Sequence, residues 1–336
     1  MLKLALLGIV AAGLVAAAPA APAARAAEPV LLRFASPAPR SDIMTLGFEP
    51  WVQNIMRDSA GGLDIKTLYS VVDHRHAYDS AINGVVDMSW VIMGPYPGQF
   101  PRTDVASLPF EGGGGYSSAV ALWRLFDRGV ISEEYGKIKL LGLFVYPSSG
   151  FHTNKPVKTL ADLKGLKLGM TGRALSELTV ALGGTPVTMT PADWYQALQR
   201  GLIGGVLTAW PGIHPYKLDE VTKYHLDGAF GRVPAFVFMN KSAFAALPEN
   251  ARKVIDQDSG EKLSAHMGTV IDGLEAQGRD HAKSLGHDVY ELAPDEAAVW
   301  RQRASPIMQK WVEGTPGGAK ILAAYRAEYQ ATLKSR

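Results

Sequence analysis

Between residues 154 and 206, short apolar runs alternate with longer segments whose apolar residues recur at helical spacing. Leu175, Leu178 and Leu182 mark one such helical face, and the paired glycines at 183–184 end it. The pattern predicts strands at 166–170, 186–189 and 202–207, separated by helices at 173–182 and 191–200. Strands that alternate with helices in this way indicate βαβ units on a parallel sheet, where ligands bind near the carboxyl ends of the strands.

The residues before this window predict a second unit of the same kind. Its expected strands lie at 30–35, 63–69, 85–92 and 138–146, and its helices lie near 46–56, 75–83 and 117–128. The chain then crosses between the units at 146–150, and an apolar strand at 235–239 indicates that it returns. The remaining expectations are a helix from 247 toward 285, a strand at 287–292 and a packed helix around 300–311.

These elements predict an α/β protein with a two-lobed, periplasmic-binding-protein-like fold. Each lobe is expected to be a mostly parallel sheet flanked by helices, with hinge crossovers between the lobes. Lobe 1 is predicted to comprise residues 28–149 and to return at about 236–280, and lobe 2 to comprise 150–235, completed by about 281–336. Two lobes joined by several crossovers can close on a small solute by hinge motion.

The N-terminal segment, residues 1–27, has the composition of a secretory signal peptide. Lys3 supplies a positive charge, residues 4–15 form an apolar stretch, and Ala-Arg-Ala at 24–26 matches a cleavage site, so cleavage is expected near Ala26 or Ala27. The apolar stretch is too short for a stable membrane span. The chain contains no cysteine, so neither a lipid-attachment cysteine nor a disulfide framework is expected, and a periplasmic location is predicted.

Composition narrows the possible partners. Removal of the signal segment leaves about 310 residues, enough for two lobes with separate cores. The formal net charge is +2 and no basic tract is present, so nucleic acid is not an expected partner. No motif in the chain requires a cofactor.

Three polar groupings suggest chemistry but fit it poorly. Asp-His-Arg-His at 73–76 offers metal ligands, but histidines two positions apart diverge on a helix, so we interpret them as helix-start residues and expect no metal site. The glycines at 112–115 lack the Lys-Ser/Thr of a phosphate loop. Ser148 and Ser149 lie near His152 without a nucleophile elbow, so no enzyme activity is expected, although a periplasmic enzyme stays as an alternative.

Aromatic residues fall where predicted strands end, and these positions would border a cleft between the lobes. The candidates are Tyr69, Trp90, Tyr96, Trp210 and Phe236. A pocket rich in rings suits an organic solute with an apolar or aromatic body. Rings can equally hold an ammonium group by cation–π attraction.

The turn Thr171-Gly172-Arg173 is the expected place for an anion, because a helix N-terminus there follows the end of a strand. The backbone amides of Gly172 and Arg173, together with the guanidinium of Arg173, could bind a negative group. A solvated role for Arg173 in the first helical turn is an equally good interpretation.

Three segments resemble the solute-binding proteins of tripartite ATP-independent periplasmic (TRAP) transporters, of the dicarboxylate-binding type. They are NKPVKTLADLKGLK at 154–167, LGGTPVTM at 182–189 and YQALQRG at 195–201, with weaker similarity at 84–87, 94–101, 108–110, 217–225 and 239–241. The resemblance implies capture of a small organic solute, foremost an organic acid, and its delivery to paired small and large membrane subunits that use an ion gradient. The element HTNKP at 152–156 resembles one branch of the family and implies that Phe151 and His152 face the ligand, with a buried structural histidine as the alternative.

One departure from the family pattern concerns the ligand. Family members usually carry an arginine two residues after the lysine that matches Lys167, and that arginine clamps the ligand carboxylate, whereas this chain has Gly169. The aspartate of the family's GVVDG is also absent, since residues 201–205 read GLIGG. Few groups replace an arginine fork on a carboxylate. The solute is therefore expected to be either an acid held at a displaced site or a neutral or cationic compound, and a sensor on the same fold stays open.

Overall fold

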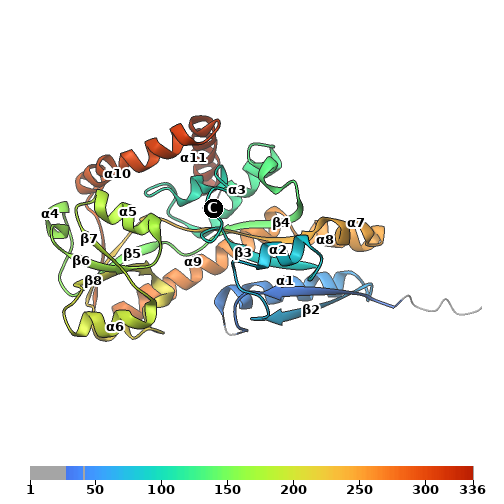
Figure 1. Ribbon diagram of the computed structural model, residues 1–336, viewed down its shortest axis with the longest axis horizontal. Coiled ribbons are helices and arrows are strands. Elements are labelled where there is room, and N and C mark those ends of the chain that lie inside the picture. Colours follow the sequence, from blue (N-terminus) through green and yellow to red (C-terminus); the bar gives the residue numbers. More distant parts are fainter. Residues whose placement is uncertain (1–27, 41, 336) are drawn as a thin grey trace, which may run out of the picture.

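The computed structural model describes residues 28–40 and 42–335. The predicted signal peptide, with its cleavage site, lies outside the described residues. Two bodies, each built on its own sheet, lie side by side along the long axis of the molecule (Figure 1). No helix within these two ranges is long and apolar enough to cross a membrane.

Lobe 1 is built on a five-stranded sheet with the order β2-β1-β3-β10-β4. Its strands are β1 (Val30–Ser36), β2 (Leu63–Tyr69), β3 (Met88–Ile92), β4 (Ile138–Val145) and β10 (Pro234–Asn240). β1 pairs in parallel with β2 and β3, whereas β10 is antiparallel to both β3 and β4. The sheet is therefore parallel only over its first three strands.

Lobe 2 is built on a six-stranded sheet with the order β11-β9-β5-β8-β6-β7. Its strands are β5 (Ser149–Thr153), β6 (Lys167–Met170), β7 (Thr185–Thr188), β8 (Gly205–Ala209), β9 (Tyr224–Asp227) and β11 (Asp288–Glu291). β6 is parallel to β7 and β8, and β9 is parallel to β11, but β5 runs antiparallel to its neighbours β8 and β9.

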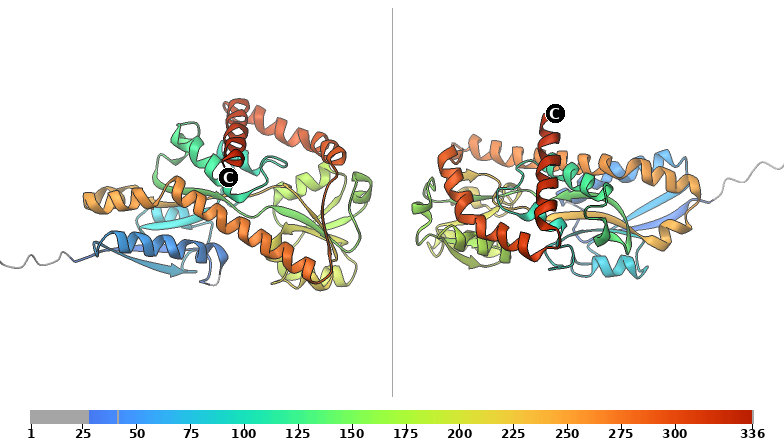
Figure 2. Two further views of the ribbon diagram at one scale, coloured as in Figure 1. Left: turned by 180° about the vertical axis from the view of Figure 1, so that it is seen from behind. Right: turned by 90° about the horizontal axis from the view of Figure 1, so that it is seen from above.

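Helices flank both sheets. They are α1 (Ile43–Asp58), α2 (Ala77–Ile82), α3 (Gly115–Asp127), α4 (Leu160–Leu163), α5 (Arg173–Ala181), α6 (Pro191–Gln199), α7 (Lys241–Ala246), α8 (Glu249–Asp258), α9 (Glu261–Ser284), α10 (Pro294–Gly314) and α11 (Gly318–Lys334). Short 3-10 turns are η1 (Thr103–Ser107), η2 (Ser132–Tyr135), η3 (Trp210–Gly212) and η4 (Leu218–Glu220). α9 runs behind both lobes, and α10 and α11 form an arc from lobe 2 back to lobe 1 (Figure 2).

Side-chain alternation along β10 shows how the sheet of lobe 1 is buried on both faces. Phe236 and Phe238 enter the apolar cluster shared with α2, α3 and α11, whereas Val237 and Met239 enter the cluster shared with α1, α8 and α9. A strand covered on both faces reads as a continuous apolar run, which is the pattern at 235–239. The apolar residues at every position of β10 therefore match its place in the interior of the sheet.

The predicted fold class is confirmed, and the predicted elements differ from the structure mainly at three places. The helix expected from 247 toward 285 is broken at Gly260, whose φ of 73° ends α8 and starts α9. Strands β5 (SGFHT) and β9 (YHLD) were not predicted, because polar residues interrupt their apolar pattern. The C-terminal α11 packs on α3 of lobe 1, since Ile321 and Tyr325 belong to its core, whereas 281–336 was assigned to lobe 2.

Candidate functional site

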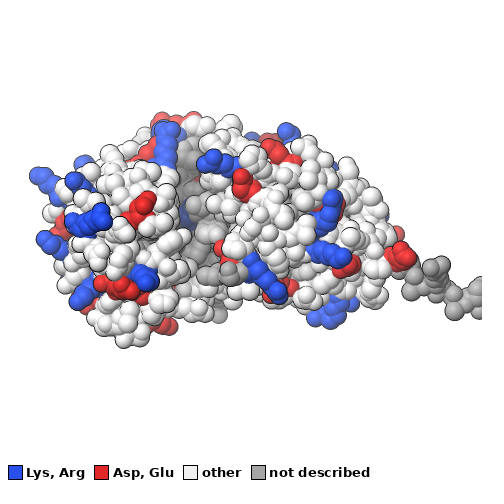
Figure 3. All heavy atoms as spheres, turned by 60° about the horizontal axis from the view of Figure 1, so that its bottom comes forward, with Lys and Arg blue, Asp and Glu red and all other residues white. Residues whose placement is uncertain are grey.

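The surface is hollowed between the two lobes, where a groove separates the two bodies (Figure 3). The carboxyl ends of β1 and β2 in lobe 1 point toward lobe 2 (Figure 1). In lobe 2, α5 begins directly after β6. The side chain of Leu175 in its first turn lies 3.6 Å from the position that a β-carbon on Gly231 would take, and Gly231 belongs to a segment that crosses between the lobes. The first turn of α5 therefore borders the junction between the lobes.

Three neighbouring segments that cross between the lobes form the hinge, and α10 with α11 makes a further connection away from them (Figure 2). The first runs from β4 to β5 and the second from β9 to β10, and they pair with each other through Tyr146 N–H to Val233 O at 2.7 Å and Ser149 N–H to Gly231 O at 3.1 Å. The third is α9. Short paired connections with a helix behind them suit a hinge, because few backbone angles need to change for the lobes to move.

A buried network of charges joins these crossings. Arg232 has a side chain that is 1% exposed, and it pairs with Glu275 of α9 at 3.2 Å. It also donates to the carbonyls of Tyr146 and Gly113. Glu275 accepts from Ser148 N–H at 2.5 Å. Burial raises the pKa of the Glu275 carboxyl, and the positive charge of Arg232 opposes that rise. The network fixes all three crossings relative to one another.

A second ion pair extends the network toward lobe 2. Arg279 Nη1 lies 3.0 Å from Asp227 Oδ2, and Asp227 also accepts from Trp210 Nε1–H at 3.0 Å. The predicted ligand contact Trp210 is fully buried, and its indole serves this hinge network. Sequence reasoning missed Asp227 and Arg279, because their pairing joins positions that are 52 residues apart in the chain.

Half-buried aromatic residues lie at the strand ends of lobe 1. Tyr69 ends β2, and its hydroxyl lies 3.5 Å from Glu49 Oε1. The hydroxyl of Tyr96 donates to the carbonyl of His74, and burial raises the pKa of Tyr96 to about 12. Trp90 is fully buried beneath them, with its Nε1–H bonded to Ser36 Oγ at 3.0 Å. Tyr69 and Tyr96 thus keep exposed surface, and Trp90 does not.

His74 lies beside these aromatic residues, and sequence reasoning did not suggest it as a ligand-binding residue. Its ring packs edge-on against Trp90 with a centroid distance of 4.9 Å. Its Nδ1 is buried and lacks a hydrogen-bond partner among the residues that the structure describes. Burial lowers the pKa of His74. Asp73 and His76 beside it do occupy a helix start, since Asp73 accepts from His76 N–H at 3.0 Å.

Phe151 and Phe236 lie in the lobe cores and have no surface on the groove in this structure. The ring of Phe151 packs edge-on against Phe230 and Trp300 at 4.8 and 5.6 Å. Phe236 packs against Phe100 at 5.0 Å. Both side chains sit on strands whose two faces are covered, so proximity of a strand to the cleft did not imply exposure of its rings.

His152 is the first member of a buried chain of three histidines. Its Nε2 lies 3.2 Å from the carbonyl of Thr208 and must therefore donate, which leaves its Nδ1 to accept from His225 Nδ1–H at 2.8 Å. His225 Nε2 in turn accepts from His287 Nδ1–H at 3.0 Å. Burial lowers the pKa of both His152 and His225 to about 3, so the chain is neutral. This is a structural role, the alternative considered for His152.

Gly169, the position of the missing family arginine, faces a filled space. It lies in β6 between Leu168 and Met170, whose side chains enter the core on the opposite face. A β-carbon on Gly169 would lie 2.8 Å from Ile203 Cδ1 and 3.1 Å from Trp194 Cδ1. Trp194 and Ile203 therefore occupy the volume into which a side chain at position 169 would project.

Replacing Gly169 with alanine should lower the free energy of unfolding by about 1–3 kcal/mol, because the added methyl group overlaps packed side chains. An arginine there should cost at least as much. Urea unfolding of Gly169→Ala against Gly136→Ala would measure the packing cost, because Gly136 has a φ of −58° that alanine adopts without strain. Gly136, with a nearest atom at 3.6 Å, is the matched control without strain. Unchanged stability in Gly169→Ala would contradict the packing argument.

Gly172 and Arg173 are exposed at the start of α5. Gly172 is the N-cap with a φ of 82°, a conformation that favours glycine. The side chain of Arg173 is 83% exposed and pairs with Glu177 one turn later at 2.6 Å. The pair leaves the guanidinium free to move, since exposed pairs one helical turn apart hold together weakly.

A cavity of about 970 Å³ lies on another side of the hinge. It is walled by α9, β11, α10 and the second crossing, and none of the ten predicted site residues lines it. The strand ends of lobe 1 do not reach it either. The groove fits a solute site better than this cavity does, because ligands of such sheets bind at the carboxyl ends of strands and hinge closure acts across the groove.

Comparison with known proteins agrees with this architecture. The profile of the family described as "Bacterial extracellular solute-binding protein, family 7" (DctP) matches residues 34–315. The outer membrane transporter protein TsaT of Comamonas testosteroni is 28% identical over 95% of this chain and 97% of its own length.

Solved structures extend the similarity. A TRAP solute-binding protein from Rhodoferax ferrireducens, in complex with copurified benzoate, is 29% identical, covers 91% of this chain and 99% of its own, and has a TM-score of 0.79. A marine metagenome TRAP solute-binding protein specific for aromatic acid ligands, in complex with 3-hydroxybenzoate, is 26% identical, covers 90% and 98%, and also has a TM-score of 0.79.

The fold, the hinge and the match over most of the chain define a periplasmic-type solute-binding receptor. The chain belongs to the bacterial extracellular solute-binding proteins of family 7. It is a TRAP-type solute-binding protein, and the predicted family is confirmed.

Proposed function

We propose that this protein is exported, loses its signal segment near Ala26 or Ala27, and captures a small aromatic carboxylate in the groove between its lobes. It then delivers the solute to the paired small and large membrane subunits of a TRAP transporter and performs no covalent chemistry. The observation that carries the proposal is the similarity, over about nine-tenths of the chain, to solute-binding proteins whose structures hold benzoate or 3-hydroxybenzoate.

Two features of the groove support an aromatic acid. Tyr69 and Tyr96, with His74 beside them, offer half-buried ring surface on the lobe 1 side. On the lobe 2 side, Arg173 and the backbone amides at the start of α5 offer positive charge. A ring held by lobe 1 and a carboxylate held by lobe 2 would draw the lobes together, which is how a ligand closes a hinge.

The second candidate is a neutral or cationic solute. Gly169 favours it, because Trp194 and Ile203 fill the place of the arginine that clamps carboxylates in the family. Thermal unfolding against organic acids, amines and neutral aromatics separates the two. A ligand at 100 times its dissociation constant stabilises by about 2.7 kcal/mol, which should raise the midpoint by several degrees. If only amines or neutral compounds raise the unfolding midpoint, the proposal that the ligand is an aromatic acid is wrong.

Substituting Arg173 with alanine should weaken benzoate binding at least about tenfold, or 1.4 kcal/mol, because a charge-assisted hydrogen bond is lost. Glu177→Gln should leave binding equal or tighter, since it frees the guanidinium from its partner. Arg200→Ala is the matched control: Arg200 is exposed in the same lobe but caps the far end of α6. Calorimetric titration measures all three, and an unchanged affinity in Arg173→Ala would remove it from the site.

A further inference from the structure

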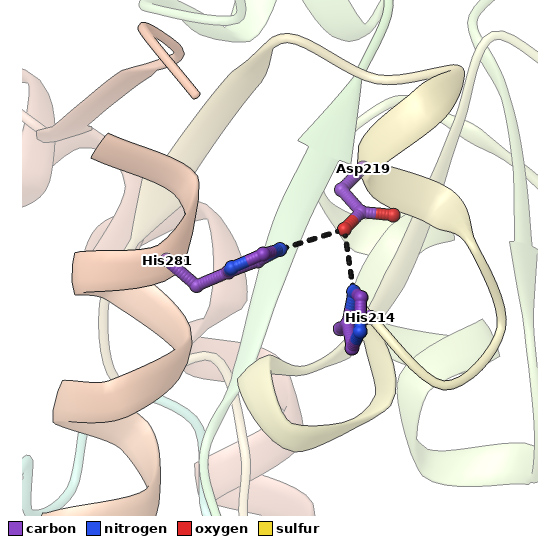
Figure 4. Close-up of side chains that lie close together, drawn as sticks. All are labelled: His214, Asp219 and His281. Carbon is purple, nitrogen blue, oxygen red and sulfur yellow. Dashed lines mark hydrogen bonds and ion pairs between the residues drawn. The ribbon is translucent and has the colours of Figure 1, made fainter. Parts of the chain in front are cut away.

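A group of nitrogen and oxygen donors lies in lobe 2, outside every residue assigned to the solute. His214 Nδ1 is 2.9 Å from Asp219 Oδ2, and His281 Nε2 is 2.8 Å from the same oxygen (Figure 4). The ligand atoms of the three residues all lie within 4.8 Å of one another. They line a surface pocket of about 620 Å³.

Two separate elements position these side chains. His214 and Asp219 come from the turns that follow β8, where the left-handed backbone of Lys217, with a φ of 56°, reverses the chain into η4. His281 lies in the last turn of α9. A β-carbon on Gly278 would lie 2.8 Å from Trp210 Cβ, so the glycine permits close contact between α9 and these turns.

The central carboxylate is anchored, whereas the imidazoles keep access to solvent. The side chain of Asp219 is 8% exposed, that of His281 37% and that of His214 75%. Burial by itself raises the pKa of the Asp219 carboxyl, but its hydrogen bonds to both imidazoles outweigh burial and lower it. The carboxylate is thus ionised and faces the two rings.

This donor set matches a known class of ion. Imidazole nitrogens with a carboxylate oxygen suit zinc and its first-row neighbours, and three protein ligands leave a fourth position open. Metal–ligand distances of about 2.0–2.2 Å place the donors of a tetrahedral ion roughly 3.3 Å apart. The two pairs that include Asp219 Oδ2 would therefore open by about half an ångström from their present hydrogen-bonded distances. We propose that His214, Asp219 and His281 bind one divalent transition-metal ion of the zinc class.

The histidine chain supplies an independent observation. His287 lines the same pocket, and its Nδ1–H is committed to His225 Nε2. The Nε2 of neutral His287 therefore carries a free lone pair. Metal-binding histidines commonly donate their other ring N–H to a fixed partner, which sets the tautomer. Among the residues that line this pocket, His287 has a ring nitrogen suited to support the fourth position through water.

Binding would join the turns after β8 to the end of α9. Because α9 packs on lobe 1 as well, through contacts with α1, α3 and β4, the ion would brace the lobe 2 end of the helix that spans the hinge. Metal binding at this pocket does not depend on which solute the groove binds, so the two sites can be tested separately.

The test is calorimetric titration of the purified protein with Zn²⁺ at about pH 7.5, where free imidazoles are neutral. We expect one ion per chain, and at least about a tenfold loss of affinity in each of His214→Ala, Asp219→Asn and His281→Ala. His76→Ala is the control, because His76 also contacts an aspartate at 2.9 Å on the surface but belongs to no cluster of three metal-ligating side chains among the described residues. With Co²⁺ as the probe, tetrahedral absorption bands should appear in the wild type and vanish in Asp219→Asn.

Folding of the variants is checked by thermal unfolding without metal. His214→Ala should keep the wild-type midpoint, because its side chain is mostly exposed, so its loss of affinity reports on the site itself. Absence of Zn²⁺ binding by the wild type would overturn the proposal. Binding that survives all three substitutions, or that is lost in His76→Ala, would overturn it as well.

Discussion

Arg232→Met should lower the free energy of unfolding by about 3–5 kcal/mol, because it leaves the carboxylate of Glu275 buried without its partner. The two side chains are 1% and 5% exposed, and Arg232 also holds the carbonyls of Gly113 and Tyr146. The loss should fall on both lobes together, since the pair joins all three crossings. Urea unfolding followed by circular dichroism measures it.

A double variant, Arg232→Met with Glu275→Gln, should recover part of that loss, since removing both charges of a buried pair costs less than removing one. Lys253→Met is the surface control: Lys253 pairs with Glu249 at 2.6 Å, but both side chains are about 70% exposed, so the change should stay within about 0.5 kcal/mol. A loss below about 1 kcal/mol in Arg232→Met would show that the network does not hold the hinge.

Acid should destabilise the protein through His152 and His225. Their folded pKa of about 3 lies below the ordinary value of about 6.5, so the fold holds both rings neutral while the unfolded chain gains protons as pH falls. The stabilisation is complete above the unfolded pKa and is lost between about pH 6.5 and 3. Below pH 6 the slope should approach about 1.4 kcal/mol per pH unit for each histidine.

Among the described residues, the carboxyls of Asp104, Glu134 and Glu275 act in the opposite sense, because burial raises the pKa of each. Burial, with the nearby charge of Glu134, raises the pKa of Asp104 to about 7, so the fold gains a proton there as pH falls. The histidine effect is therefore best measured in Asp104→Asn by urea unfolding at pH 7, 6 and 5. Nitrogen-15 NMR of the imidazoles gives the direct reading: His152 and His225 should stay neutral down to about pH 5. Titration of either ring near its ordinary pKa would contradict the prediction that burial keeps these histidines neutral.

Several features of the candidate site were within reach of sequence reasoning. The start of α5 at Gly172 and Arg173 was predicted because glycine, helix periodicity and the preceding apolar run are local signals. The family resemblance rested on sequence motifs such as LGGTPVTM, and the comparisons confirm it. Burial of the predicted aromatic residues could not be predicted from the sequence, because a strand end at a cleft and a buried strand face have the same composition.

His152 illustrates the difference at one residue. Its position before Lys155 and Pro156 suggested a cleft role, yet its ring forms hydrogen bonds to residues 56 and 73 positions away in the chain. The His214–Asp219–His281 group likewise includes a contact across 62 positions. Such clusters carry no local spacing, so no motif could have marked them.

The sequence by itself determined the α/β class, the crossings between two lobes, the family and the position of the turn at the start of α5. Apolar periodicity, glycines and family motifs are signals that act over short stretches of chain. Only the tertiary structure decided the antiparallel directions of β5 and β10, the packing of α11 on lobe 1, the filling of the space beside Gly169 and the joining of the hinge by Arg232 and Glu275. These depend on which distant segments share a face, and hydrogen bonding and packing across the two sheets settle that only when the whole chain is folded.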